Sequence, residues 1–220
     1  MKILCIIPAY NEEKNIAKTI SSVKKYINDI LVVNDGSKDN TQKLAQETGA
    51  RVISHIINRG QGASLETGNE YARRHNYDVV VHFDADGQFL AEEIPDILKP
   101  IIENAYPISF GSRFLNKKSQ IPWFKKHVIM RIAKAINYIF LGVKTSDPQS
   151  GFRAMSKEAL EKIRIENDGM AHCSEILAKT NKYKFVFKEV PITVLYNEFG
   201  QSLGSGFRTV KDLLINKINK

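Results

Sequence analysis

The sequence has few cysteines and no long apolar run, and both features limit the classes of protein to which it could belong. Cys5 and Cys173 are the only cysteines in 220 residues, and they lie far apart. This count excludes a disulfide-stapled fold and a cysteine-rich metal site, so a reducing compartment is expected. No apolar stretch approaches the roughly 18 residues of a membrane span, and no signal peptide precedes the first strand-like segment. We therefore expect a cytoplasmic protein that is soluble or peripheral on the inner face of a membrane.

Acidic residues are missing from one segment of the chain. The formal net charge is +8, from 32 Lys and Arg against 24 Asp and Glu. Eight basic residues and no acidic one occur between Arg113 and Lys144, so this segment carries the whole excess. An anion is the expected partner: phosphate, an anionic membrane surface or nucleic acid. A solvated basic face is the alternative. One tryptophan and no interleaved aromatic residues argue against nucleic acid.

Strand-like and helix-like segments alternate in the first half of the chain. Apolar runs predict strands at 2–8, 29–33, 51–54 and 79–83, with helices between them. Asn11 is the expected N-cap of the first helix, which would run to about Tyr26. The connections are short, so we expect right-handed crossovers and a parallel sheet. A hydrophobic content of 43% is sufficient for one α/β unit or two small ones.

The second half continues with mixed elements. We expect helices at 90–104, 123–140, 156–163 and 171–182, with Pro100 ending or kinking the first of them. Strands are expected at 108–110, 185–187 and 190–196, and a turn with a short strand at 147–153. The 123–140 helix carries a wide apolar stripe opposite its lysines. It would lie either in the core or on a membrane surface.

Three polar turns fall at the carboxyl ends of predicted strands, at 10–13, 34–37 and 84–88. In an open α/β sheet, ligands bind beyond these ends, so the turns should converge on a nucleotide-type site. Asp84 and Asp86 form an Asp-x-Asp pair, which can hold a divalent cation and, through it, a diphosphate. The alternative is a polar turn after a core strand. An EF-hand loop fits badly, because Phe89 and Pro95 occupy its glycine and glutamate positions.

Six motifs occur in one order along the chain: Pro8–Glu13, Asn34–Ser37, Asn58–Gly62, Asp84–Asp86, Gly111–Phe114 and Asp147–Arg153. The ordered set resembles family-2 glycosyltransferases, most closely the branch of dolichyl- and polyprenyl-phosphate mannosyl- and glucosyltransferases. The resemblance covers nearly the whole chain. It implies a GT-A (Rossmann-like) α/β fold, with a mostly parallel sheet flanked by helices in a single compact unit. Residues 1–110 would bind the nucleotide sugar and residues 111–220 the acceptor.

The resemblance also implies roles for the residues that match. The nucleoside pocket would be lined by Pro8, Ala9, Tyr10 and Glu12, with Asp35 at the base and the glycine loop at Gly60 and Gly62. The diphosphate would face Asp84, Ala85 and Asp86, and Mg²⁺ or Mn²⁺ would be held by Asp84, Asp86 and Gln88. The expected catalytic residues are Asp86, Asp147, Glu175, Arg113 and Arg131, with the two arginines at phosphate groups.

The chain departs from the family pattern in three places. Gln61 stands where a lysine is common between the two glycines. Asn197 and Glu198 replace an arginine often found after the late strand. The two transmembrane helices that many lipid-phosphate members append are not in this sequence.

The resemblance implies an inverting, metal-dependent transfer from a GDP- or UDP-linked sugar. We expect a polyprenyl phosphate acceptor, which is already an anion and needs arginines rather than a base. The alternative is a saccharide hydroxyl in the synthesis of cell-surface polysaccharide or glycolipid. That acceptor would require Asp147 or Glu175 to take a proton.

Two rival classes are weaker. A dinucleotide-binding oxidoreductase would use Gly60-x-Gly62, but Leu65 occupies the third glycine position and the loop does not follow the first strand. A non-catalytic carbohydrate-binding or membrane-surface module would not need the Asp84 and Asp86 pair.

Overall fold

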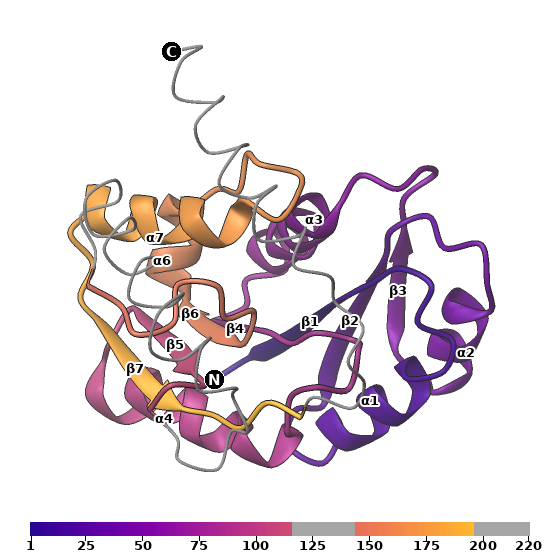
Figure 1. Ribbon diagram of the computed structural model, residues 1–220, viewed down its shortest axis with the longest axis horizontal. Coiled ribbons are helices and arrows are strands. Elements are labelled where there is room, and N and C mark those ends of the chain that lie inside the picture. Colours follow the sequence, from indigo (N-terminus) through magenta and orange to yellow (C-terminus); the bar gives the residue numbers. More distant parts are fainter. Residues whose placement is uncertain (116–143, 196–220) are drawn as a thin grey trace, which may run out of the picture.

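The computed structural model describes residues 1–115 and 144–195 (Figure 1). In these residues one sheet of seven strands forms, in the order β3-β2-β1-β4-β6-β5-β7. The strands are β1 (Ile3–Ala9), β2 (Asp29–Asn34), β3 (Arg51–Ser54), β4 (Val79–His82), β5 (Ile108–Ser112), β6 (Arg153–Ser156) and β7 (Phe187–Pro191).

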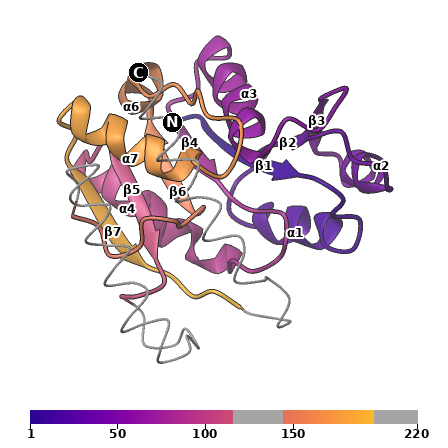
Figure 2. The same cartoon turned by 45° about the horizontal axis from the view of Figure 1, so that its top comes forward.

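A layer of helices covers each face of the sheet. The helices are α1 (Ile16–Val23), α2 (Thr41–Glu47), α3 (Gln61–Arg74), the 3₁₀ helix η1 (Ala91–Glu93), α4 (Ile94–Asn104), α6 (Lys157–Lys162) and α7 (His172–Lys182). Helices α1, α2 and α4 lie on one face, and α3, α6 and α7 lie on the other (Figures 1 and 2). The predicted α/β fold with a mostly parallel sheet is confirmed.

Strand direction brings the polar loops to one edge of the sheet. β1 pairs in parallel with β2 and β4, and β3 pairs in parallel with β2. β6 runs antiparallel to both β4 and β5, so β5 points the same way as β4. The carboxyl ends of β1 to β5 and the amino end of β6 therefore share an edge. The loops after residues 9, 34, 54, 82 and 112 meet there, together with the loop that ends at residue 152.

Burial on both faces explains the continuous apolar strands. In β1, Cys5 and Ile7 pack in the cluster that contains α1 and α4, while Leu4 and Ile6 pack in the cluster that contains α3, α6 and α7. Gly68 lets α3 approach β1 closely, because a Cβ there would lie 2.4 Å from the Cγ2 atom of Ile6. The site is thus built on a rigid, two-sided core.

Two local predictions were wrong. Asn11 does not cap the first helix, which begins at Ile16. It takes a left-handed conformation (φ 55°), and its Oδ1 accepts a hydrogen bond from Lys38 N at 2.9 Å. Two late strands were expected at 185–187 and 190–196. The structure instead has the single strand β7 and a separate antiparallel bridge between Phe89 and Val194.

Other expectations meet the structure in part. Helix α4 continues through Pro100 to Asn104. Proline has no N–H to donate to the carbonyl of Asp96, four positions earlier, and Asp96 is an exposed residue. The predicted 123–140 helix, Arg131 and residues beyond 195 lie outside the described residues. Within the described parts, none of the helices is both long and apolar enough to cross a membrane.

Candidate active site

Hydrogen bonds tie the loop after β1 to the loop after β2. The predicted donor-pocket residues of the first loop are Pro8, Ala9, Tyr10 and Glu12. Asp35 N donates to the carbonyl of Ala9 at 2.8 Å, and Glu12 N donates to Thr41 Oγ1 at 2.7 Å. Tyr10 is 44% exposed and Glu12 is half-buried. Burial raises the pKa of Glu12, and the Asp86 carboxylate adds to this rise against the hydrogen bond from Asn15.

The carboxylate of Asp35 holds the loop between β3 and α3. It is buried and accepts hydrogen bonds from Arg59 N at 2.9 Å and Gly60 N at 2.7 Å. His55 Nδ1 lies 2.7 Å from the same carboxylate, and His55 Nε2 lies 2.9 Å from Thr67 Oγ1. The contact of Asp35 with a nucleobase stays a prediction. In the structure, Asp35 holds the glycine loop in place through these hydrogen bonds.

Asp84 is clamped between two groups from distant parts of the sequence. Gln61 Nε2, in the first turn of α3, donates to Asp84 Oδ1 at 2.8 Å. Gly151 packs on the other oxygen so closely that a Cβ there would lie 2.4 Å from Asp84 Oδ2. Burial raises the pKa of Asp84 to about 7, and the neighbouring Asp86 carboxylate adds to this rise.

Asp86 lies in the turn that follows. Gln88 N donates to Asp86 Oδ1 at 3.0 Å, and Gly87 takes the positive φ of 73° that closes this turn. Thr19 Oγ1 donates to the carbonyl of Ala85 at 3.1 Å and fastens the turn to α1. Burial raises the pKa of Asp86 as well. Two carboxylates whose charged forms are both disfavoured are suited to a cation.

The donor set suits a hard cation. Asp84, Asp86 and Gln88 offer carboxylate and amide oxygens, which Mg²⁺ and Mn²⁺ prefer. No cluster of three or more His, Cys, Asp or Glu residues suited to a metal occurs within residues 1–115 and 144–195. A cation held here would complete its shell with water and diphosphate oxygens, as Mg²⁺ commonly does.

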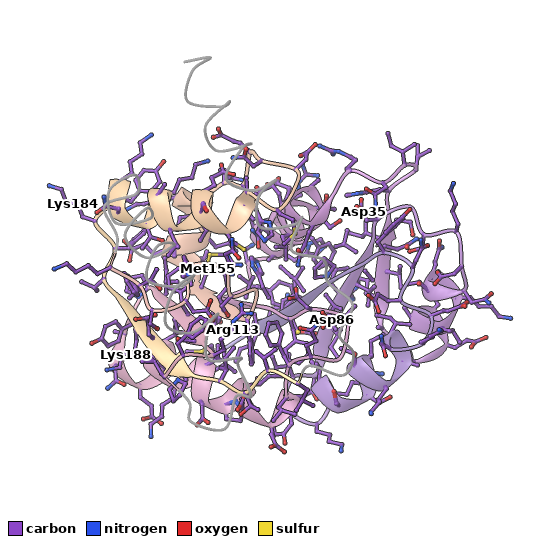
Figure 3. All side chains as sticks on the ribbon, viewed as in Figure 1. Asp35, Asp86, Arg113, Met155, Lys184 and Lys188 are labelled. Atoms are coloured by element: carbon purple, nitrogen blue, oxygen red, sulfur yellow. The ribbon has the colours of Figure 1, made fainter. Side chains whose placement is uncertain are left out.

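Arg113 and Asp147 form an ion pair at the same edge. Arg113 Nε donates to Asp147 Oδ2 at 2.6 Å, and Arg113 N donates to the same oxygen at 3.2 Å. The side chain of Asp147 is 1% exposed, whereas that of Arg113 is 22% exposed. Figure 3 shows Arg113 and Asp86 toward the middle of the view, whereas Lys184 and Lys188 lie at the β7 side. The structure therefore pairs two predicted site residues with each other.

Glu175 has a different environment from the other predicted acids. Its carboxylate accepts hydrogen bonds from Glu166 N and Asn167 N, both at 2.9 Å. Lys179 Nζ lies 2.7 Å from it. Burial opposes the charged form, but the hydrogen bonds from Lys179 and Asn167 outweigh it and lower the pKa of Glu175. A carboxylate so engaged is a weak proton acceptor.

A buried cluster behind Asp84 was missed by sequence reasoning. Arg153 is 1% exposed and donates to the Ser150 carbonyl at 2.9 Å and to Cys173 Sγ at 3.2 Å. Burial opposes the thiolate of Cys173, but His172 and Arg153 outweigh it and lower the pKa of Cys173 to about 6. The Ser-Gly-Phe-Arg motif was a usable signal for Arg153. Nothing in the sequence pattern marked Cys173.

The fold and the acidic edge define a class of enzyme, and the comparisons agree with it. Residues 4–164 match the family model described as glycosyl transferase family 2. The chain therefore belongs to glycosyltransferase family 2 and is a glycosyltransferase.

Known relatives extend the sequence likeness over nearly the whole chain. The UDP-N-acetylglucosamine–dolichyl-phosphate N-acetylglucosaminyltransferase of Methanococcus voltae is 34% identical over 99% of this chain and 97% of its own length. The polyprenol monophosphomannose synthase of Mycolicibacterium smegmatis is 34% identical over 92% of this chain and 81% of its own.

A solved structure supports the GT-A fold. The glucosyl-3-phosphoglycerate synthase of Mycobacterium tuberculosis, in complex with Mn²⁺, UDP and phosphoglyceric acid, has a TM-score of 0.75 at 19% identity. The alignment covers 97% of this chain and 76% of that one. Another structure of the same enzyme holds Mg²⁺ and UDP.

Proposed function

We propose that this enzyme transfers a sugar from a UDP- or GDP-linked donor to a polyprenyl phosphate, with inversion at the anomeric carbon. One observation carries the choice of acceptor. The two carboxylates that could act as a base, Asp147 and Glu175, are both engaged, by Arg113 and by the 166–167 backbone. A saccharide hydroxyl would need a base to take its proton, whereas a phosphate does not.

On the donor side, the chain's acidic turn would hold the diphosphate through a cation. Asp86 and Gln88, with Asp84 beside them, would bind Mg²⁺ or Mn²⁺. When bound, the cation stabilises the negative charge that develops on the leaving diphosphate. Tyr10 and the buried strand ends at Pro8 and Ala9 would border the nucleoside.

On the acceptor side, Arg113 would orient the lipid phosphate. A guanidinium can bind phosphate with two parallel hydrogen bonds, and Asp147 fixes its orientation through Nε. A phosphate oxygen then attacks the anomeric carbon as the bond from that carbon to the diphosphate breaks. A single displacement of this kind inverts the configuration. Arg131, outside the described residues, stays a predicted second phosphate contact.

The names of the relatives support this acceptor. Both the Methanococcus and the Mycolicibacterium enzymes carry a polyprenyl-type acceptor in their names, and both align over more than nine-tenths of this chain. The division of labour between residues 1–110 and 111–220 is part of the same proposal. The two halves share one sheet, because β6 lies between β4 and β5 and β7 pairs with β5.

A matched pair of assays tests the proposal. Purified enzyme is given UDP- and GDP-sugars with Mn²⁺, together with either a short polyprenyl phosphate or a panel of free saccharides. We expect a glycosyl phospholipid to form and excess chelator to stop its formation. Transfer to a saccharide and none to the lipid phosphate would assign the alternative acceptor.

The predicted membrane contact needs its own test. Flotation with anionic liposomes at low and high salt would detect recruitment by the basic segment from Arg113 to Lys144. Each lysine or arginine near such a surface contributes about 1 kcal/mol, so binding should weaken at high salt. Neutral liposomes are the control, and equal binding to both kinds would refute an electrostatic contact.

A further inference from the structure

The loop at 166–168 lies directly on the amino end of α3. The carbonyl oxygen of Asn167 would be 1.9 Å from a Cβ added to Gly62, and that of Asp168 would be 2.4 Å from one added to Gly60. Ala63 N also donates to the Asp168 carbonyl at 3.2 Å. The two glycines therefore serve a close approach between backbones, in addition to any contact with a ligand.

Glu175 holds this loop. Four donors meet its carboxylate: the backbone N–H groups of Glu166 and Asn167 at 2.9 Å each, Asn167 Nδ2 at 2.8 Å, and Lys179 Nζ at 2.7 Å. The Glu175 side chain is only 9% exposed. Both oxygens are thus used by a single loop and by a lysine one turn further along α7.

A continuous set of contacts runs from this carboxylate to the acidic turn. Glu175 fixes the 166–168 loop, and the loop packs on Gly60 and Gly62. Between those glycines stands Gln61, whose amide donates to Asp84 Oδ1 at 2.8 Å. Each step in this set is either a hydrogen bond or a backbone approach too close to admit a side chain on the glycine.

We propose that Glu175 is a positioning residue: it holds the 166–168 loop against the amino end of α3, and so sets where Gln61 presents Asp84 to the donor diphosphate. This inference rests on the proposed function for its consequence in catalysis. It replaces the expectation that Glu175 is a catalytic residue, including the alternative in which Glu175 or Asp147 takes a proton from a saccharide hydroxyl. The two roles predict different behaviour for the same substitution.

Glu175→Gln is the direct test. It keeps the shape of the side chain but places an NH₂ group opposite N–H donors. We expect faster amide hydrogen exchange at Glu166 and Asn167 and, beyond the direct contact, at Ala63. We also expect the affinity for Mn²⁺ with UDP or GDP to fall by about 10- to 100-fold, the range typical when a supporting partner of a metal site is lost.

Glu166→Gln is the matched control. The Glu166 side chain also contacts Lys179, at 2.8 Å, but it is 71% exposed and does not hold the loop backbone. Exchange at Ala63 and nucleotide affinity should stay at the wild-type level. Gly62→Ala is the second variant, because its Cβ would collide with the Asn167 carbonyl without touching Glu175. It should reproduce both effects of Glu175→Gln.

The outcomes separate the possibilities. If Glu175→Gln keeps wild-type exchange and nucleotide affinity while turnover collapses, Glu175 is a base and the inference is overturned. If Glu175→Gln does not fold, Gly62→Ala decides, and unchanged nucleotide affinity with Gly62→Ala overturns the inference. Should the wild-type protein bind neither UDP nor GDP with Mn²⁺, the proposed function fails, while loss of protection at Ala63 still tests the loop contact.

Discussion

The two sides of the site use their charged groups in different ways. On the side that we propose for the donor, Asp35 binds the backbone N–H groups of Arg59 and Gly60, and its side chain is 4% exposed. On the side that we propose for the acceptor, Asp147 accepts hydrogen bonds from Nε and, at a longer distance, from the backbone N of Arg113, whose side chain is 22% exposed. The first arrangement fixes a loop. The second holds the guanidinium of Arg113 in one orientation while leaving part of its side chain exposed to solvent.

Under the proposed function, this difference would let one sheet edge serve two substrates. A carboxylate bound to the backbone cannot move without moving the loop, so the donor side is organised before any ligand arrives. The guanidinium of Arg113 is held by Asp147 at Nε and donates from Nη2 to the carbonyl of Gln149 at 3.4 Å, a long hydrogen bond that a phosphate oxygen could replace. Preorganisation suits the leaving group, where charge develops, and adaptability suits an acceptor that enters from outside.

The largest effect should come from the acidic turn between the two sides. Asp86→Asn removes one of the two carboxylate charges expected at the cation. We expect turnover to fall by roughly 10²-fold or more, as when one electrostatic stabiliser is lost. Initial rates across a Mn²⁺ titration measure this, with the circular dichroism melt as a control for folding. If the wild-type enzyme kept its full turnover in excess chelator, the cation would have no part in the mechanism.

The next largest effect should fall on the acceptor alone. Arg113→Ala removes a charge-assisted contact worth about 1.5–3 kcal/mol, so the KM for polyprenyl phosphate should rise by about 10- to 100-fold. The KM for the donor should change little, which would confirm that the two sides act separately. Lys25→Ala, at an exposed basic residue outside the Arg113–Lys144 segment, is the control for simple loss of one positive charge. Equal losses for donor and acceptor would contradict the comparison.

Substitution of Asp35, on the proposed donor side, should lower the thermal stability of the protein. Asp35→Asn leaves one of the backbone donors at Arg59 or Gly60 facing an NH₂ group. A buried group left unsatisfied costs about 1–3 kcal/mol. For a chain of this size, that lowers the Tm by about 2–12 °C. Differential scanning calorimetry measures the shift, and Asp168→Asn, in the half-exposed pair with Arg59, is the control. An unchanged Tm with weaker nucleotide binding would show that Asp35 acts on the base only.

The sequence predicts the strands and the acidic edge well, because these depend on local pattern. Apolar runs such as Val79–Val81 form buried parallel strands, and topology then collects their polar ends. The sequence could not predict which groups donate hydrogen bonds to each carboxylate. Glu175 was expected at the acceptor, and yet its donors lie in the 166–167 backbone, a detail that no periodicity encodes. Gly151 reads as a turn glycine, but its need for close approach comes from Asp84, in a different strand and loop.

The antiparallel β6 was a second feature that local pattern could not specify. Residues 153–156 are Arg-Ala-Met-Ser, which is too short and too mixed to predict a strand direction, and their direction depends on the long connection from residue 113. Insertion of β6 between β4 and β5 places the 147–152 loop beside Asp84. The comparison between the two sides of the site therefore rests on a pairing that only the folded chain reveals.

The last prediction concerns pH and sharpens the role of Asp84, which lies between the two sides. Burial, with Asp86 beside it, raises the pKa of Asp84 to about 7, so a proton competes with the cation there. With a UDP-sugar, whose diphosphate does not itself titrate near neutrality, the affinity in the presence of Mn²⁺ should be about twofold weaker at pH 7 than at pH 8.

Stability without a cation should change in the opposite direction, because a higher pH then weakens the folded state. Folded Asp84 keeps a proton that it loses near pH 4 in the unfolded chain, so its own contribution to the free energy of unfolding should fall as pH rises from about 4 to about 7, by about 1.4 kcal/mol for each pH unit at most. Asp84→Asn should flatten both profiles. A wild-type affinity that is constant from pH 6 to pH 8 would show that Asp84 is already ionised, and that Gln61 holds a charged carboxylate.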